Sequence, residues 1–328
     1  MRTKEELMKK MYTNLVRCRK LDEKLIECLM AGELHTFFHS GQGHEAVGVA
    51  LCALLKEGDY VFYNHRGHGV SKCLPRGMSA EAILAEHYGK ATGGAGGFAG
   101  FHYSANELGI LGMMGMVAGE LTLAAGAGIA CQLRGKGAVV VCCFGDGATG
   151  RGPFHEALLM SSTWKLPVIW VCENNRYQQF TCTDLTHCRP NMADFAQSFD
   201  MPATIVDGQE VMALYEAAGP AIERARAGEG PSFLEVKTYR YRSHVEGVPD
   251  FSVEYEGGMR PEEEVKDWKK RDPIRLFRES LLEKGILTDA EVGKIDRSVM
   301  EEMEEAHRHV FDATLPSPDS FGKALYAD

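Results

Sequence analysis

Residues 139–177 of this 328-residue chain read VVVCCFGDGATGRGPFHEALLMSSTWKLPVIWVCENNRY. Residues 139–144 are an apolar run of strand length, and residues 168–172 are a second one. Pro153 suits the first turn of a helix, because its missing N–H is not needed there. We expect that helix to end near Trp164. Two buried strands joined by a helix predict a right-handed parallel β–α–β unit.

Polar groups follow both predicted strands, at the edge where ligands of open α/β sheets bind. Asp146 comes just after the first strand, and Asn175 lies 29 residues further on, after the second. Carboxylate and amide oxygens are ligands that magnesium accepts together with phosphate and water. Gly145, Gly147 and Gly150 would let backbone N–H groups approach a diphosphate. Either end alone is typical of an ordinary turn or strand cap, but together they predict a magnesium diphosphate site.

The Gly-Asp-Gly segment, followed about thirty residues later by Asn-Asn, is similar to the thiamine diphosphate motif. The wider text closely resembles the alpha subunit of the thiamine diphosphate-dependent component of 2-oxo acid and acetoin dehydrogenase complexes. This resemblance extends from the first predicted helix to about Asp272. It implies an α/β fold with a parallel sheet flanked by helices, the thiamine diphosphate-binding (pyrophosphate-domain) fold. It also implies thiamine diphosphate and magnesium as cofactors.

Length and composition fit such a fold. We expect a single domain over residues 1–328, with an amphipathic N-terminal helix within residues 1–35 and a helical C-terminal extension over residues 261–328. An acidic cluster at residues 301–305 is expected to be a solvated helix face. A net charge of −10 argues against a nucleic-acid surface.

Residues 110–133 form a long apolar run whose only charge is Glu120. Its length would allow a membrane span, but its five glycines and Glu120 favour a buried helix, so we expect no membrane association. We expect that residues 1–31 are not a signal or transit peptide. Ten cysteines lack any paired C-x-x-C spacing, so we expect reduced core cysteines and a cytoplasmic location.

The resemblance assigns further residues to the cofactor site. Arg66 and His68 match the family's arginine and histidine at the cofactor and substrate edge, and His65 stands where pyruvate-type relatives commonly have tyrosine. Gly115 and Val117 belong to a segment whose backbone contacts the cofactor's aminopyrimidine in the family. For His65 and His68 a purely structural role stays equally open.

The family's third metal ligand is the backbone carbonyl of Tyr177, beside Asp146 and Asn175. Ala148, in the glycine loop, is a further expected cofactor contact.

Arg240 and His244 match an arginine and a histidine of a family landmark. The resemblance makes Arg240 a diphosphate contact and makes His244 a cofactor contact and the first candidate for proton transfer, followed by His68 and His102. A solvated loop at His244 and a plain glycine-rich loop at His102 are the structural alternatives. Residues 245–260 are expected to be a mobile loop.

Family members place the cofactor between two domains, and this chain has room for only one of them. The resemblance therefore implies a separate beta subunit, in an α2β2 assembly, which supplies a glutamate to the aminopyrimidine. It also implies a lipoyl-bearing acyltransferase that receives the two-carbon unit.

The substrate implied is a small molecule, a 2-oxo acid such as pyruvate or acetoin. The segments around His68 and His244 resemble acetoin-type subunits, Tyr-Arg-Tyr at residues 239–241 is similar to the pyruvate type, and branched-chain 2-oxo acids stay open. A split transketolase half and a catalytically silent binding or regulatory subunit are the alternative functions.

Overall fold

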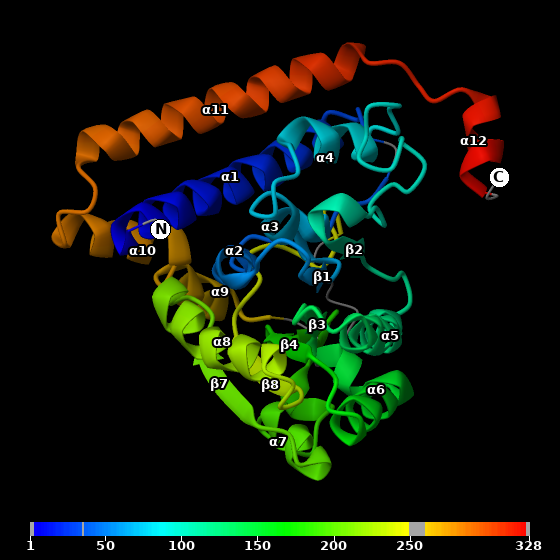
Figure 1. Ribbon diagram of the computed structural model, residues 1–328. Coiled ribbons are helices and arrows are strands. Elements are labelled where there is room, and N and C mark those ends of the chain that lie inside the picture. The colour runs from blue at the N-terminus through cyan, green and yellow to red at the C-terminus, as the bar shows by residue number, and fades with distance from the viewer. Residues whose placement is uncertain (1–2, 35, 249–259, 326–328) are drawn as a thin grey trace.

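The computed structural model of the chain describes residues 3–34, 36–248 and 260–325 (Figure 1). At its centre lies a parallel sheet of six strands in the order β2-β1-β3-β4-β8-β7. Its strands are β1 (Tyr60–Phe62), β2 (Ile110–Gly112), β3 (Val140–Gly145), β4 (Val168–Asn174), β7 (Ala203–Asp207) and β8 (Ser232–Lys237). The predicted α/β fold with a parallel sheet flanked by helices is confirmed.

Helices cover both faces of this sheet (Figure 1). Those in the described part of the chain are α1 (Lys4–Met30), α2 (Glu45–Leu54), α3 (Val70–Cys73), α4 (Ala80–His87), α5 (Gly119–Arg134), α6 (Gly152–Thr163), α7 (Ala193–Ala196), α8 (Val211–Arg226), α9 (Glu262–Lys269), α10 (Pro273–Glu283), α11 (Asp289–Asp312) and α12 (Pro318–Leu325). A short antiparallel pair, β5 (Tyr177–Gln178) and β6 (Thr181–Cys182), follows β4. Within the described residues, no helix has both the length and the apolar character that crossing a membrane requires.

Alternation along the strands divides the core in two. Cys143 packs in a cluster with α1, α2, α4 and α8, whereas its neighbour Cys142 packs in a cluster with α5, α6 and α7. Successive side chains of a strand point to opposite faces, so each central strand is buried on both sides. Eight of the ten cysteines are buried and all ten are free thiols, as expected, but Cys188 is exposed.

The β–α–β unit predicted from residues 139–177 is present as β3, α6 and β4. The prediction of one buried helix over residues 110–133 is wrong, because β2 occupies its beginning and α5 starts at Gly119. Helix α5 is also half-exposed, since Leu123 is 49% and Leu133 is 83% exposed. Gly128 fits closely against Val168 of the same chain, while Gly126 faces open space.

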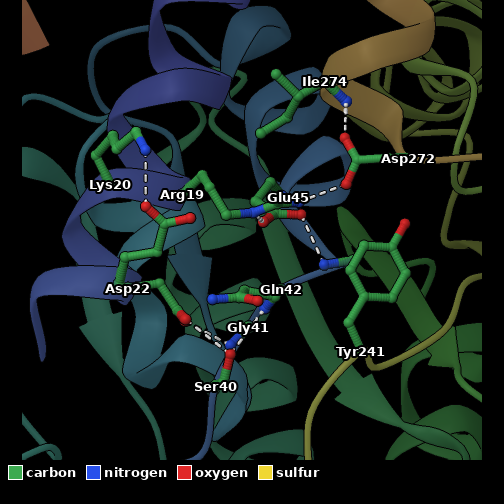
Figure 2. A network of polar contacts seen from close by, with 12 residues as sticks. Arg19, Lys20, Asp22, Ser40, Gly41, Gln42, Glu45, Tyr241, Asp272 and Ile274 are labelled. Atoms are coloured by element: carbon green, nitrogen blue, oxygen red, sulfur yellow. Dashed lines mark hydrogen bonds and ion pairs between the residues drawn. The ribbon is translucent and has the colours of Figure 1, made fainter. Parts of the chain in front are cut away.

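Helix α1 carries polar residues that hold a loop (Figure 2). Asp22 accepts hydrogen bonds from the Ser40 hydroxyl at 2.7 Å and from the Gly41 N–H at 2.6 Å. Arg19 binds Glu45 and donates to Asp272, at the start of α10, at 2.8 Å. Residues of α1 therefore hold both the loop that precedes α2, at Ser40 and Gly41, and the first residue of α2, Glu45.

The acidic cluster at residues 301–305 is only partly a solvated face. Glu302 pairs with Arg17 at 2.6 Å, and Glu304 pairs with Lys24 at 2.7 Å, so α11 is tied to α1 along its length. The loop expected over residues 245–260 lies mostly outside the described residues, from 249 to 259.

Alanine substitutions at Gly48 and, as a control, at Gly126 test the close contact between α2 and α3. A Cβ at Gly48 would lie 2.0 Å from the Ser71 carbonyl oxygen, whereas a Cβ at Gly126 would meet nothing within 4 Å. We expect Gly48→Ala to lower the free energy of unfolding by roughly 1–3 kcal/mol through overpacking. Gly126→Ala, the control, should raise it by up to about 1 kcal/mol through helix propensity. Urea unfolding of the purified chain measures both, and equal effects would contradict the packing described.

Candidate functional site

A cavity of about 560 Å³ opens at the carboxyl ends of β1, β3 and β4. Its volume lies within the range of about 300–1,000 Å³ that small-molecule sites occupy. The strand order places it at the point where the chain leaves β1 for β2 on one side and β3 for β4 on the other. Open α/β sheets bind ligands at such a switch point.

Asp146 and Asn175 meet at this edge, as predicted. The parallel register pairs Gly145 with Glu173, so the segments that follow β3 and β4 leave the sheet at the same edge. The Asn175 N–H donates to Asp146 Oδ1 at 3.3 Å. Asp146 is 1% exposed, and within the described chain no hydrogen bond reaches its Oδ2.

Burial raises the pKa of Asp146 to about 6, against the hydrogen bond from the Asn175 N–H. Asn175 Oδ1 accepts from the Tyr177 N–H at 3.1 Å and keeps a second lone pair. A buried carboxylate oxygen without a partner, on a residue that is hydrogen-bonded to the Asn175 backbone, fits a divalent cation with oxygen ligands.

The glycine loop lies against the cavity in a short 3₁₀ turn, Asp146–Gly150. Gly145, Gly147 and Ala148 all line the cavity, and a Cβ at Gly145 would meet nothing within 4 Å. The loop therefore leaves room for a ligand to approach its backbone.

Arg66 and His244 form one wall of the cavity. Arg66 donates through Nη1 to the His244 carbonyl at 3.0 Å and through Nη2 to His244 Nδ1. Burial and the Arg66 charge lower the pKa of His244 to about 2. His244 is thus neutral at neutral pH and accepts at Nδ1.

Of the remaining predicted residues, His65, His102, Gly115, Val117 and Tyr177 line the cavity.

His68 and Arg240, in contrast, lie behind the cavity wall. His68 is 0% exposed and stands between His39 and His87, with ring nitrogens 3.1 Å apart on each side. Arg240 is 1% exposed and donates to the Gln179 carbonyl. Its charge acts on Asp146 and His244 without its side chain lining the cavity. The structure therefore does not place His68 where it could touch a substrate directly.

Sequence reasoning missed several residues that line the cavity, among them Phe37, His39, Asn64 and Glu120. Burial raises the pKa of Glu120 to about 7. A single carboxylate in a long apolar run was a signal for Glu120.

A buried ion pair supports this edge of the sheet from behind. Lys72 Nζ lies 2.6 Å from Glu173 Oε1, and both side chains are at most 1% exposed. His44, the residue that precedes α2, lies 2.9 Å from Glu173 Oε2 through Nδ1.

Charge balance at this pair is reflected in the pKa values. Burial would raise the pKa of Glu173, but the charge of Lys72 and the hydrogen bond of His44 outweigh it and lower that pKa to about 2. Burial lowers the pKa of His44, so the imidazole is neutral and donates from Nδ1.

Known proteins with similar sequences belong to one family. A sequence model of the family described as "Dehydrogenase E1 component" matches residues 13–319. The alpha subunit of the acetoin:2,6-dichlorophenolindophenol oxidoreductase of Bacillus subtilis (strain 168) is 37% identical over 318 residues, which is 96% of this chain and 92% of that protein. The subunit of the same name from Cupriavidus necator is 34% identical over 98% of this chain and 95% of its own length. The pyruvate dehydrogenase E1 component subunit alpha of Rhizobium meliloti is 34% identical over 97% of this chain and 88% of that protein.

Removing Lys72 should leave Glu173 buried without its countercharge. We expect Lys72→Met to lower the free energy of unfolding by about 3–5 kcal/mol, and adding Glu173→Gln to recover part of the loss. Lys56→Met is the matched control, since Lys56 is 63% exposed and 3.7 Å from Glu223, and should cost at most about 1 kcal/mol.

The same ion pair predicts a dependence of stability on pH. Because the folded pKa of Glu173 is lowered from 4.5 to about 2, the contribution of Glu173 to the free energy of unfolding is present above about pH 4.5 and is lost as pH falls towards 2. Urea unfolding at several pH values measures both effects; a Lys72→Met loss no larger than that of the control would contradict them.

Proposed function

Because the chain belongs to the dehydrogenase E1 component family, we propose that it is the alpha subunit of a thiamine diphosphate-dependent oxidoreductase. The proposed reaction is cleavage of a 2-oxo acid such as pyruvate, or of acetoin, and transfer of the two-carbon unit to a lipoyl-bearing acyltransferase. The family match over residues 13–319 and the names of relatives at 34–37% identity support this function.

The observation that carries the proposal is the buried Asp146 carboxylate beside Asn175. Asp146 Oδ2 has no hydrogen-bond partner in the described part of the chain, although the residue is 1% exposed. A buried acceptor of this kind costs free energy unless a ligand satisfies it. We propose that Asp146, Asn175 and the Tyr177 carbonyl hold a magnesium ion, and that this ion holds the diphosphate.

The other predicted residues receive roles that fit their places. The backbone N–H groups of the loop at Gly145, Gly147 and Ala148 would bind diphosphate oxygens, and Arg66 would add its charge from the opposite wall. Thiamine diphosphate, when bound, supplies a sink for the electron pair that remains when a carbon–carbon bond breaks. Gly115 and Val117 would face its aminopyrimidine, and Arg240 would contribute charge from behind the cavity wall.

Histidines of this chain would handle the protons. His244 and His102 line the cavity, and His65 lies beside His244, with ring centroids 5.5 Å apart. Burial lowers the pKa of all three, so each is neutral at neutral pH and can donate or accept a proton.

An alpha subunit implies a beta subunit, and we propose an α2β2 assembly in which the beta subunit closes the cavity. An exposed apolar stretch beside the cavity supports this contact. Met116 is 69%, Val117 is 59% and Leu123 is 49% exposed, and contiguous apolar exposure marks interaction surfaces.

Replacing Asp146 tests the metal site. Asp146→Asn keeps the side-chain size but removes the anionic oxygens. We expect magnesium-dependent affinity for thiamine diphosphate to fall at least about tenfold to a hundredfold, since even outer-shell changes cost that much. Titration calorimetry on the assembly with its beta subunit measures the affinity. Asp184→Asn, at a carboxylate that is 71% exposed, should leave it unchanged, and unchanged binding in Asp146→Asn would refute the site.

Activity should depend on the partner. The purified chain alone should show negligible turnover of pyruvate or acetoin with 2,6-dichlorophenolindophenol as electron acceptor, whereas the chain mixed with its beta subunit should turn over at least one of them. Robust turnover by the homogeneous chain alone would contradict the proposed division of the site.

A further inference from the structure

Three histidines form a hydrogen-bonded row that begins at the cavity and ends inside the fold. His39 Nδ1 lies 3.1 Å from His68 Nε2, and His68 Nδ1 lies 3.1 Å from His87 Nε2. His87 Nδ1 lies 2.9 Å from the Ile83 carbonyl oxygen in the preceding turn of α4. His39 lines the cavity, whereas His68 and His87 are buried at 0% and 5% exposure.

This row fixes the proton position on each ring. Burial lowers the pKa of all three rings, to about 3 for His39, to about 4 for His87 and well below the ordinary value for His68, so each ring is neutral with one N–H. A carbonyl can only accept, so His87 carries its proton on Nδ1 and accepts at Nε2. His68 must then donate from Nδ1 and accept at Nε2. His39 must donate from Nδ1, which leaves an unprotonated Nε2.

Backbone geometry shows that the row is held against strain. His68 adopts a φ of +41°, which is unfavourable for a residue with a side chain and persists only where the surroundings impose it. The Tyr103 hydroxyl donates to the His68 carbonyl at 2.7 Å, and Phe101 stacks on the His68 ring at 4.3 Å between centroids. The middle ring of the row is therefore fixed in position.

His39 and His244, which both line the cavity, carry their protons on different ring nitrogens. Arg66 donates to His244 Nδ1, so the neutral His244 ring carries its proton on Nε2. Its centroid lies 5.0 Å from that of His39. Within the described residues, no hydrogen bond reaches His39 Nε2, which is the edge of the ring opposite to buried His68.

We propose that His39 Nε2 is the base that takes the hydroxyl proton of a 2-hydroxy ketone such as acetoin, and that His87 is the residue that sets its tautomer through His68. This inference rests on the proposed function and narrows its substrate. A hydroxyl can donate to an unprotonated ring nitrogen. The carboxylate of a 2-oxo acid offers only acceptors at the same place, so two lone pairs would face each other.

The proton transfer balances with cleavage of the substrate. The hydroxyl proton passes to His39 Nε2, and the electron pair of the O–H bond forms the second carbon–oxygen bond of the released aldehyde. The carbon–carbon bond would break with its electron pair left on the ketone carbon, and bound thiamine diphosphate would supply the electron sink for that pair. A positioned base contributes about 10²–10⁴-fold to such a step, with the lower end expected where the pKa of the base lies well below the operating pH.

Assay of the assembly with acetoin and with pyruvate, using 2,6-dichlorophenolindophenol as acceptor, tests the proposal. We expect wild-type kcat/KM to favour acetoin. His39→Phe should lower kcat for acetoin by about 10²-fold or more, with a smaller effect on any pyruvate turnover. The positive charges of Arg66 and Arg240 favour the carboxylate of a 2-oxo acid, so they act against the preference that we propose. A higher wild-type kcat/KM for pyruvate than for acetoin would overturn the proposal.

Variants of His87 separate positioning from simple structural support. His87→Leu removes the acceptor for His68 Nδ1–H and should lower kcat for acetoin about tenfold or more, with KM little changed. His87→Gln supplies an amide oxygen as acceptor and should recover most of that loss. His309→Ala, at a side chain that is 56% exposed, should behave as wild type. Equal activity of the Leu and Gln variants would overturn the role of His87.

Two readouts keep this inference distinct from the proposed function. Calorimetric affinity for thiamine diphosphate should be unchanged in all these variants, so a loss of activity with intact binding tests the roles of His39 and His87. Absent binding in the wild-type assembly would refute the proposed function itself. A neutron structure of the assembly should show deuterium on Nδ1 and none on Nε2 of His39. Deuterium on Nε2 would overturn the inference whatever the kinetics.

Discussion

Parallel pairing of β3 with β4 is the constraint on which the cavity depends. Their register places Gly145 opposite Glu173, so the chain leaves both strands at one edge and brings Asp146 next to Asn175. A slip of one residue would send every side chain of a strand to the other face. Both strands are buried on both faces, and Glu173, which stands opposite Gly145, is held by Lys72 of α3. The parallel register of β3 and β4 is therefore the alignment from which the proposed metal site follows.

Neutral imidazoles are the second feature of the cavity. Burial lowers the pKa of each cavity histidine, and the charge of Arg66 adds to the effect on His39, His65 and His244. Rings that stay neutral act through the position of a single proton, so their hydrogen-bond partners decide whether each one donates or accepts. Arg66 sets the position of the proton on His244. The Ile83 carbonyl sets the position of the proton on His39 through the rings of His87 and His68.

Periodicity and motif spacing predicted the β–α–β unit, the sheet edge and the meeting of Asp146 with Asn175. These depend on local sequence, because apolar runs and a glycine loop mark strand ends directly. The same reasoning failed where contacts join distant segments. Nothing near His39 in the sequence indicates that His87 stands behind it, and nothing in α1 indicates that Asp22 holds Ser40 and Gly41. The apolar run before Gly119 was assigned to a helix because hydropathy does not distinguish a short buried strand from a buried helix.

Locating the ion itself tests the account most directly. Crystals of the assembly grown with manganese and thiamine diphosphate would give an anomalous peak at the ion. We predict that this peak lies at coordination distance from an Asp146 carboxylate oxygen and from Asn175 Oδ1, at the open side of the strand edge. A peak held by other residues, or a bound cofactor with no peak beside Asp146, would contradict it.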